Sequence, residues 1–407
     1  MDALEIMTNI DNVIPYYQPV FSADEHKITG YEVLGRIIAE DGEVHSLGSF
    51  FHDKDIPDEY KLEVDEAVTR KALAHFLQEK EQGLLFINRD PMHLIEGAGE
   101  TFLHMLKEFK KEGLTLDRIV LEISEKTFFG DFDKLVHLLL YYKTYGIKIA
   151  IDNVGGESGH WDRLSQFSPD ILKVDLHQLR NDISNQAYKN ILFSLSMLAR
   201  KIGSSLLFEN IEIEYQLQFA WRNGGRYYQG FYLEKPSPNF LEEAILKNKL
   251  RKKCHDFIVF ENRHLEKVYS LADKLQLKLS DQLPKLKKQA ENDDTLLLLL
   301  ANHFSNESFR LYICDENGFQ LTSNLIKIKK EWKIESEFRG KNWSWRPYFL
   351  ENIYKMRHER KGLLSDAYCD IETGELIRTF SYPIGEFQYL FMDLSYDFLF
   401  EQDGLLY

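Results

Sequence analysis

The chain has 407 residues, a formal net charge of −15, 44% hydrophobic residues and 28% charged residues. This composition is typical of a folded protein with two or three domains and excludes a disordered chain. The acidic balance disfavours non-specific binding to DNA or to an anionic membrane surface, so neither a nucleic acid nor a membrane is expected as a partner.

The cysteines and the apolar runs indicate the cellular compartment in which the protein is expected. The three cysteines show no CxxC spacing, which argues against a disulfide framework and against a thiolate zinc site. Residues 1–12 lack the apolar core of a signal peptide, and the longest apolar run, residues 296–301, is too short to span a bilayer. We therefore expect a cytoplasmic protein.

Short apolar runs alternate with helical patterns up to about residue 245. The expected strands are residues 14–20, 31–38, 84–88, 119–124, 148–152, 171–175, 205–211 and 226–233. The expected helices are residues 59–81, 100–112, 131–145, 161–167, 186–202 and 214–222. Eight strands, most of them followed by a helix, predict an α/β fold with a closed, TIM-like (β/α)₈ barrel. A doubly wound open sheet is the alternative, but no glycine-rich phosphate loop follows the first strand.

The pattern changes after the barrel. Residues 246–305 are rich in Lys, Glu, Gln and Leu and predict a helical connector. From residue 306 the pattern favours strands, and further strands are expected at residues 367–373, 375–383 and 389–394. We therefore expect a barrel domain over residues 1–245, a connector over 246–305 and a small α+β domain over 306–407.

Polar residues lie at or just after the carboxyl ends of the expected barrel strands, where barrels of this class place their chemistry. They are Glu32, Arg36, Asn88, Glu122, Glu125, Asp152, Asn153, Lys173, Asp175, Glu209, Glu212 and Gln229. Several carboxylates in one barrel mouth repel each other unless a cation lies among them. Carboxylate and amide ligands, without Cys or a strand His, suit Mg²⁺ or Mn²⁺ rather than zinc.

Two such ions can activate a water molecule and hold a phosphoryl oxygen, and a lysine in the same mouth can position that water. The residues therefore indicate a metal-dependent site for an anionic, phosphate-bearing ligand. Two other interpretations stay open. Barrels that act on sugar acids or form enolates also present acids at strand ends, and each buried charge alone could belong to a structural ion pair.

At these residues the chain resembles the EAL-domain family, which binds and hydrolyses cyclic di-GMP, over about residues 14–240. The matching motifs are Tyr17-Gln18-Pro19-Val20, Glu32-Val33-Leu34 followed by Arg36, Leu121-Glu122-Ile123-Ser124-Glu125, Lys173-Val174-Asp175, Glu209-Asn210-Ile211-Glu212 and Tyr228-Gln229-Gly230-Phe231. Each motif is short, but all occur in the family's order.

The resemblance implies roles for these residues. The implied metal ligands are Glu32, Asn88, Glu122, Asp152 and Glu209, with Lys173 assisting the hydrolytic water beside Glu32 and Glu209. Contacts to cyclic di-GMP are implied for Gln18, Leu34, Arg36, Asp175 and Gln229, and supporting roles for Glu125, Asn153 and Glu212. The implied cofactor is Mg²⁺ or Mn²⁺, Ca²⁺ is expected to bind and inhibit, and the expected product is linear pGpG.

The chain departs from the family after the fifth strand. The family has Asp-Asp-Phe-Gly-Thr-Gly where this chain has Asp152-Asn153-Val154-Gly155-Gly156-Glu157. A neutral amide is a poorer ligand for a hard divalent ion than a carboxylate is. We therefore expect a cyclic di-GMP-binding signalling protein in which hydrolysis is weak or lost. The alternatives are a fully active phosphodiesterase regulated by the C-terminal domain, and a scaffold protein that binds no nucleotide.

The C-terminal domain resembles PAS- or Cache-like sensory modules at residues 312–318 and 392–395. The aromatic segment 340–349, with Trp343, Trp345, Arg346 and Tyr348, could line a pocket for a small ligand. The same aromatic residues could instead form the core of a dimerisation module, and a homodimer is expected.

Overall fold

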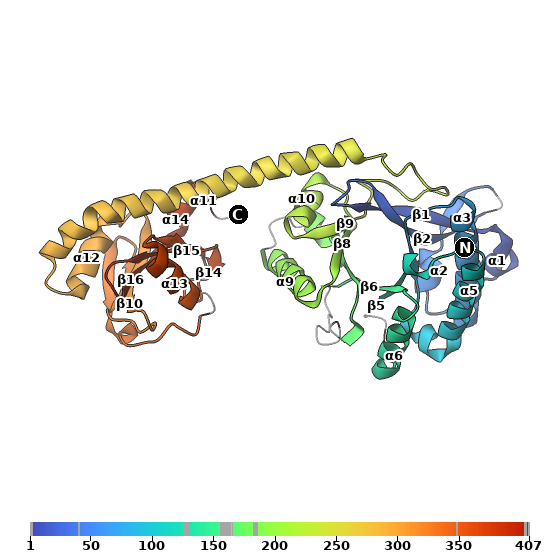
Figure 1. Ribbon diagram of the computed structural model, residues 1–407, viewed down its shortest axis with the longest axis horizontal. Helices are drawn as coiled ribbons and strands as arrows, with labels where there is room; N and C mark the ends of the chain where they lie inside the picture. The colour runs from blue at the N-terminus through green and yellow to red at the C-terminus, as the bar shows by residue number, and fades with distance from the viewer. Residues whose placement is uncertain are drawn as a thin grey trace. The chain divides into compact units, whose positions relative to one another are not determined.

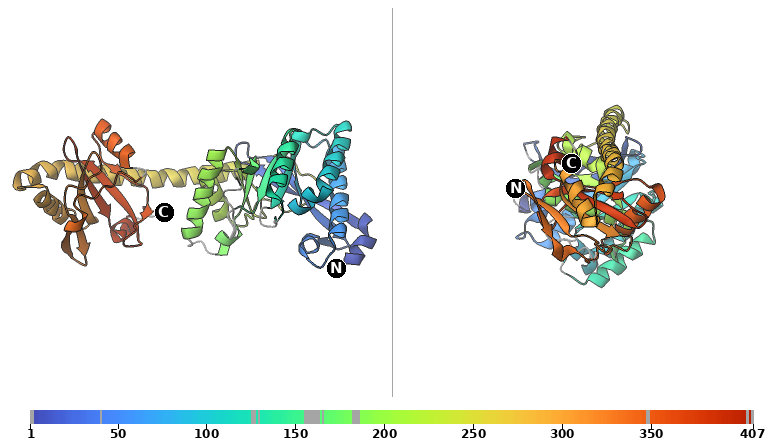
Figure 2. Two further views of the ribbon diagram at one scale, coloured as in Figure 1. Left: turned by 90° about the horizontal axis from the view of Figure 1, so that it is seen from below. Right: turned by 90° about the vertical axis from the view of Figure 1, so that its left-hand side faces the viewer.

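The computed structural model describes residues 3–39, 41–124, 128, 130–154, 164, 166–181, 186–346, 349–402 and 405. The chain forms two compact units, residues 1–255 and 256–407. The boundary between them lies inside α11 (Lys247–Gln289), which Figures 1 and 2 show as one continuous helix. None of the described helices is long and apolar enough to cross a membrane.

The first unit is a closed barrel (Figure 1), as predicted. Its ring consists of β1 (Val13–Ser22), β9 (Gly225–Tyr228), β8 (Ser205–Glu209), β7 (Ile171–Asp175), β6 (Lys148–Asp152), β5 (Ile119–Ser124), β4 (Leu84–Asn88) and β2 (Ile28–Ile38). The ring closes because β1 also pairs with β2. A short strand that the sequence did not predict, β3 (Val44–Ser46), pairs with the end of β2.

The barrel differs from an all-parallel one at its first strand. β1 runs antiparallel to both of its neighbours, β2 and β9, whereas the strands from β2 through β4 to β9 are parallel. The connection between β1 and β2 spans only residues 23–27. A connection this short can join antiparallel strands only, since a parallel pair needs a crossover of about a dozen residues or more.

Helices cover the barrel, and five of those named next begin within one residue of a predicted start, whereas the other four, none longer than six residues, were not predicted. They are α1 (Ala3–Thr8), α2 (Gly48–His52), α3 (Asp58–Gln78), α4 (Pro91–His93), α5 (Gly99–Lys111), α6 (Phe132–Lys143), α8 (His177–Asn181), α9 (Gln186–Ile202) and α10 (Glu214–Arg222). Local signals explain several ends. The Asp131 carboxylate accepts the Lys134 N–H and caps α6, and Gly203 follows α9 with a positive φ of 78°. The short helix predicted at 161–167 falls mostly outside the described residues.

The second unit is an antiparallel sheet covered on both faces. Its strands are β12 (Glu331–Glu335), β11 (Asn324–Ile328), β10 (Ser308–Asp315), β16 (Gln388–Leu394), β15 (Leu376–Pro383) and β13 (Leu363–Leu364), with β14 (Tyr368–Cys369) on β15. The described helices of this unit besides α11 are α12 (Asp293–His303), α13 (Phe349–Glu359) and α14 (Tyr396–Glu401).

Alternation along the central strands divides the core of this unit in two. Leu311 and Ile313 of β10 pack with leucines of α11 and α12, while Tyr312 and Cys314 pack on the other face with residues of α13. Successive side chains of a strand point to opposite faces, so a central strand with apolar residues at consecutive positions needs cover on both sides. The predicted small α+β domain is confirmed in this form.

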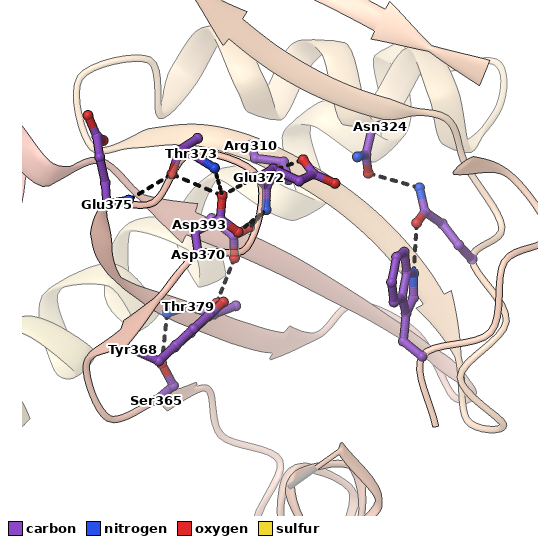
Figure 3. A network of polar contacts seen from close by, with 12 residues as sticks. Arg310, Asn324, Ser365, Tyr368, Asp370, Glu372, Thr373, Glu375, Thr379 and Asp393 are labelled. Carbon is purple, nitrogen blue, oxygen red and sulfur yellow. Dashed lines mark hydrogen bonds and ion pairs between the residues drawn. The ribbon is translucent and has the colours of Figure 1, made fainter. Parts of the chain in front are cut away.

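A polar network ties the strands of this sheet together (Figure 3). Arg310 of β10 donates from Nη1 to Asp393 Oδ2 of β16 at 3.0 Å, and from Nη2 to Asp370 Oδ2 at 2.7 Å. Thr379 of β15 donates to the other oxygen of Asp393 at 2.6 Å. Asp370 in turn accepts the Thr373 N–H at 3.0 Å, so the network also holds the turn before β15.

Three predicted strands extend two or more residues beyond the observed ones. The eighth barrel strand ends at Tyr228 rather than at residue 233, because the chain turns at Gly230, with φ 150°, and the N–H groups of Leu233 and Glu234 donate back to its carbonyl. The strand predicted at 205–211 ends at Glu209, before Asn210 with φ 56°. The strand predicted at 367–373 is reduced to Tyr368–Cys369, since Asp370 and Thr373 hydrogen-bond within a turn.

Candidate functional site

A layer of apolar residues fills the barrel, and the predicted metal ligands lie in a polar layer above it together with Gln18 and Lys173. The apolar layer consists of Val20, Phe86, Val120, Ala150, Ile171 and Leu207. Each apolar residue on a parallel strand is followed two positions later by a polar one. In chain order these polar residues are Asn88, Glu122, Asp152, Lys173 and Glu209. In the antiparallel strand β1 the polar residue is Gln18, two positions earlier. Because side chains two apart share a face of a strand, one layer of the barrel interior carries all these groups.

The ammonium group of Lys173 lies at the centre of this polar layer. Its Nζ is 3.1 Å from Glu32 Oε2, 3.1 Å from Glu209 Oε2 and 3.9 Å from Asp152 Oδ1, and it also donates to Glu122 Oε1. Lys173 is only 1% exposed. Burial opposes its charge, but the four carboxylates outweigh burial and raise the pKa of Lys173 well above its usual value.

The negative charge of Glu32 is stabilised by neighbouring side chains. Burial disfavours its charge, but Lys173 and the hydrogen bonds from Gln229 and Asn88 leave its pKa below the usual value. Gln229 Nε2 donates to Oε2 at 2.6 Å, and Asn88 Nδ2 donates to Oε1 at 2.9 Å. Glu32 is therefore an anion whose two oxygens are oriented by three neighbouring side chains.

The negative charges of Glu122 and Glu209 are stabilised less well than that of Glu32. Burial, reinforced by the charge of Glu32, raises the pKa of Glu122 well above its usual value. Burial, reinforced by Asp152 and Glu32 and only partly offset by Lys173, raises the pKa of Glu209 to about 8. Four carboxylates around one ammonium group thus leave excess negative charge that a proton or a further cation must balance.

The donor atoms suit a hard divalent ion. Glu122 Oε2, Asp152 Oδ1 and Gln229 Oε1 are buried oxygens without a hydrogen-bond partner, and such atoms are costly unless a ligand satisfies them. Among the described residues, however, no three acidic, imidazole or thiol groups are already arranged to hold a metal ion. The carboxylates surround Lys173 instead, so metal ligation by these residues stays a prediction.

Asn153 follows Asp152 in a left-handed backbone conformation, with φ 56°. Its Nδ2 donates to Asp152 Oδ2 at 2.6 Å. The amide therefore occupies one oxygen of a predicted metal ligand and brings no charge of its own. Glu125 and residues 155–163, where the sequence departs further from the family, lie outside the described residues.

Three of the predicted nucleotide contacts, Gln18, Leu34 and Arg36, lie on the hairpin formed by β1 and β2. Gln18 stands opposite Glu32, and Leu34 lies two positions further along β2, with Arg36 two positions beyond it. Arg36 is half-buried, and its Nη1 donates to the carbonyl of Gly35 at 2.9 Å. These side chains therefore rise from the polar layer toward the rim of the barrel.

Asp175 and Glu212 lie at the same end of the barrel. Asp175 Oδ1 accepts the His177 N–H at 2.7 Å at the start of α8, and it stands opposite Glu209 in the sheet register. The Glu212 N–H donates to Gln216 Oε1 at 2.7 Å, and the Glu212 side chain is half-buried. Both residues thus take part in local backbone structure beside the carboxylates.

The sequence did not predict the residues that contact Arg36. Ser46 Oγ accepts from Arg36 Nη1 at 3.3 Å, and the guanidinium lies 5.7 Å from the centroid of the Tyr16 ring. The alternation of β1 could have placed Tyr16 beside Gln18 on the inner face. Ser46 gave no signal, because β3 has only three residues and all of them are exposed.

The sequence and the structure of this chain are similar to those of known proteins. The EAL domain model matches residues 1–236, and the model of an EAL-domain associated signalling protein domain matches residues 240–406. The chain is 52% identical to YkuI, an EAL-domain containing protein of Bacillus subtilis, over 407 residues and 100% of both chains. The crystal structure of YkuI in complex with c-di-GMP and calcium superposes with a TM-score of 0.95 and covers 100% of both chains.

A more distant relative matches the barrel alone. The probable cyclic di-GMP phosphodiesterase PdeA of Escherichia coli is 24% identical over 241 residues, which cover 57% of this chain and 32% of PdeA. The barrel, the carboxylate layer around Lys173 and the match over residues 1–236 lead to one conclusion: this chain belongs to the EAL-domain family.

Proposed function

We propose that this protein binds cyclic di-GMP together with a divalent cation at the mouth of its barrel, and that it hydrolyses the nucleotide slowly or not at all. The observation that carries the proposal is the layer of four carboxylates that share the single ammonium group of Lys173. The YkuI structure, with c-di-GMP and calcium, supports the ligand.

The residues divide into two groups in this proposal. Glu32, Asn88, Glu122, Asp152 and Glu209 would hold Mg²⁺ or Mn²⁺. When bound, such an ion supplies charge compensation and an acidified water molecule. Lys173 holds the acids in place and keeps a positive charge beside the phosphate, while Arg36 contacts a phosphate from the rim.

We propose slow hydrolysis because Asn153 stands where the family has an aspartate. An aspartate at this position would add a negative charge beside Asp152, but the amide donates a hydrogen bond there instead. A site with one carboxylate fewer holds a second divalent ion less well. Ligand binding needs charge compensation of the phosphates, whereas hydrolysis also needs an activated water, so binding survives the loss better than turnover.

The second candidate function is an active phosphodiesterase regulated by the C-terminal unit. It is favoured by Glu32, Lys173 and Glu209, since each catalytic residue implied by the family resemblance is present in the polar layer. This candidate predicts pGpG as the product, with turnover lost in Glu32→Gln.

We also propose a homodimer, a cytoplasmic location and a sensory role for the C-terminal unit. The Phe391 ring stacks on Tyr312, with centroids 5.2 Å apart, and on Phe349 at the start of α13, with centroids 5.4 Å apart. Their packing favours a filled core on this sheet face over a pocket for a small ligand.

Calorimetric titration tests the binding proposal. The wild-type protein should bind cyclic di-GMP in the presence of Ca²⁺, and Glu32→Gln should weaken binding by tenfold or more, because one anion of the layer is lost. Glu25→Gln, an exposed acid on the turn of the same hairpin, is the matched control and should bind as the wild type does. Wild-type protein that releases no heat with nucleotide and cation would favour the scaffold hypothesis.

A further inference from the structure

The short strand β3 contributes nothing to the core, so its role must lie elsewhere. Val44, His45 and Ser46 are all exposed. The strand pairs antiparallel with the end of β2, and its register places Ser46 opposite Arg36 and His45 opposite Ile37. Ser46 and Arg36 therefore share one face of the sheet, while His45 points to the other face.

Three contacts fix the guanidinium of Arg36. Nη1 donates to Ser46 Oγ at 3.3 Å and to the Gly35 carbonyl at 2.9 Å. On β1, the Tyr16 ring lies beneath the guanidinium, 5.7 Å from its central carbon. Tyr16 reaches this place because it pairs with Leu34, two positions before Arg36, across the hairpin. The contacts therefore come from β2 itself and from β1 and β3, the two strands beside this end of β2.

Ser46 is itself held in place. Its Oγ accepts the Gly48 N–H at 3.2 Å, at the start of α2. The hydroxyl oxygen thus accepts from two donors, while the hydroxyl hydrogen remains available for an acceptor such as a phosphate oxygen. An arginine fixed before the ligand arrives loses less side-chain freedom on binding, so it binds a phosphate more tightly than a mobile one.

We propose that Ser46 is a positioning residue that, together with the Tyr16 ring, presents the guanidinium of Arg36 to a phosphate of the bound nucleotide. This inference rests on the proposed function, because it requires cyclic di-GMP to bind at the barrel mouth. It gives β3 a role: the strand carries Ser46 to the rim.

The test compares the Kd for cyclic di-GMP, measured by calorimetry with saturating Ca²⁺, across variants of the full chain. Ser46→Ala should weaken binding about three- to tenfold, the usual net effect of one hydrogen bond that orients another side chain. Ser46→Thr keeps the hydroxyl and should restore binding to within about twofold. Tyr16→Leu should weaken binding, and Tyr16→Phe, which keeps the ring, should not.

Two controls separate positioning from general damage. His45→Ala changes the same strand on its other face and should bind as the wild type does. Binding of Ca²⁺ alone should be equal in wild type and Ser46→Ala, because Arg36 is not among the predicted metal ligands. Ser46 is exposed, so losing the hydrogen bond to Gly48 should lower the melting temperature only slightly.

The possible failures are distinguishable. If the wild type binds and Ser46→Ala binds equally well, or if Ser46→Thr is as weak as Ser46→Ala, the positioning role is wrong while the proposed function stands. If His45→Ala weakens binding as much as Ser46→Ala, the effect belongs to β3 as a whole and the role of Ser46 is wrong. If the wild type does not bind, the proposed function itself fails.

Discussion

The hydrogen bond between Asn153 and Asp152 joins two neighbouring side chains at the end of β6, where the family has two carboxylates. The amide nitrogen lies 2.6 Å from Asp152 Oδ2 and stabilises that oxygen without a metal ion. Replacing the amide by a carboxylate would turn this attraction into a repulsion that a cation relieves.

Asn153→Asp should therefore increase Mn²⁺-dependent formation of pGpG, by about tenfold or more for one restored metal ligand. Aspartate tolerates the left-handed backbone of this position about as well as asparagine, so the fold should be kept. Product is measured by chromatography. Asn153→Ser, which restores no charge, is the control. An unchanged rate in Asn153→Asp would show that Asn153 alone does not limit turnover.

Asn210 adopts the same left-handed conformation after Glu209, with φ 56°. Glycine adopts positive φ without a steric penalty. Asn210→Gly should leave the free energy of unfolding within about 0.5 kcal/mol of the wild type, whereas Asn210→Ala should lower it by about 1 kcal/mol. Urea unfolding of both variants checks this, and equal stabilities would contradict it.

The strands show how far the sequence could predict the fold. The eight barrel strands and the alternation along them could be predicted, because each strand is a buried apolar run that ends at polar residues. Since residues two apart share a face, the sequence also predicted which acids share the barrel mouth. The central place of Lys173 depends on the packing of the closed ring, and no spacing in the sequence encodes it.

Other elements escaped prediction for local reasons. β3 has no apolar residue that is buried, and its partner is decided by the register with β2. The early end of β9 is caused by close packing. A Cβ added to Gly230 would lie 2.2 Å from the Ile211 carbonyl oxygen, so the chain turns at this glycine to pass residue 211. Such a contact between distant residues leaves no periodic signal.

Gly230→Ala should therefore lower the free energy of unfolding by about 2–3 kcal/mol, because the added methyl group overlaps backbone atoms that cannot move aside. Gly224→Ala is the matched control. Gly224 also has a positive φ, 75°, but no atom lies within 4 Å of an added Cβ, so its substitution should cost only about 1 kcal/mol. Similar losses in the two variants would contradict the packing argument.

At the scale of the whole molecule, the two units depend on different polar centres. In the C-terminal unit, Arg310 is the cation that Asp370 and Asp393 share (Figure 3). Asp393 is only 1% exposed, and burial raises its pKa even though Arg310 and Thr379 favour its charge. Removing the guanidinium takes from the buried Asp393 carboxylate the cation that donates a hydrogen bond to it.

Arg310→Met should therefore destabilise the C-terminal unit by about 3–5 kcal/mol, the usual cost of breaking a buried ion pair from one side. In thermal unfolding of the full chain near neutral pH, the transition of the C-terminal unit should occur at a lower temperature than in the wild type. Arg357→Met, which removes an exposed ion pair to Glu316, is the control and should change stability by less than about 1 kcal/mol. An unchanged transition in Arg310→Met would show that the network does not stabilise the unit.

The central claim concerns the barrel: the carboxylate layer binds cyclic di-GMP with a divalent cation, while Asn153 leaves hydrolysis weak or absent. The most direct test measures both quantities in one sample of the full chain, with nucleotide and Mn²⁺ at saturating concentrations. Equilibrium dialysis gives the bound nucleotide, and chromatography gives pGpG over time. The account predicts near-stoichiometric binding with little or no product over many minutes. Rapid, complete conversion to pGpG, or no bound nucleotide at all, would contradict it.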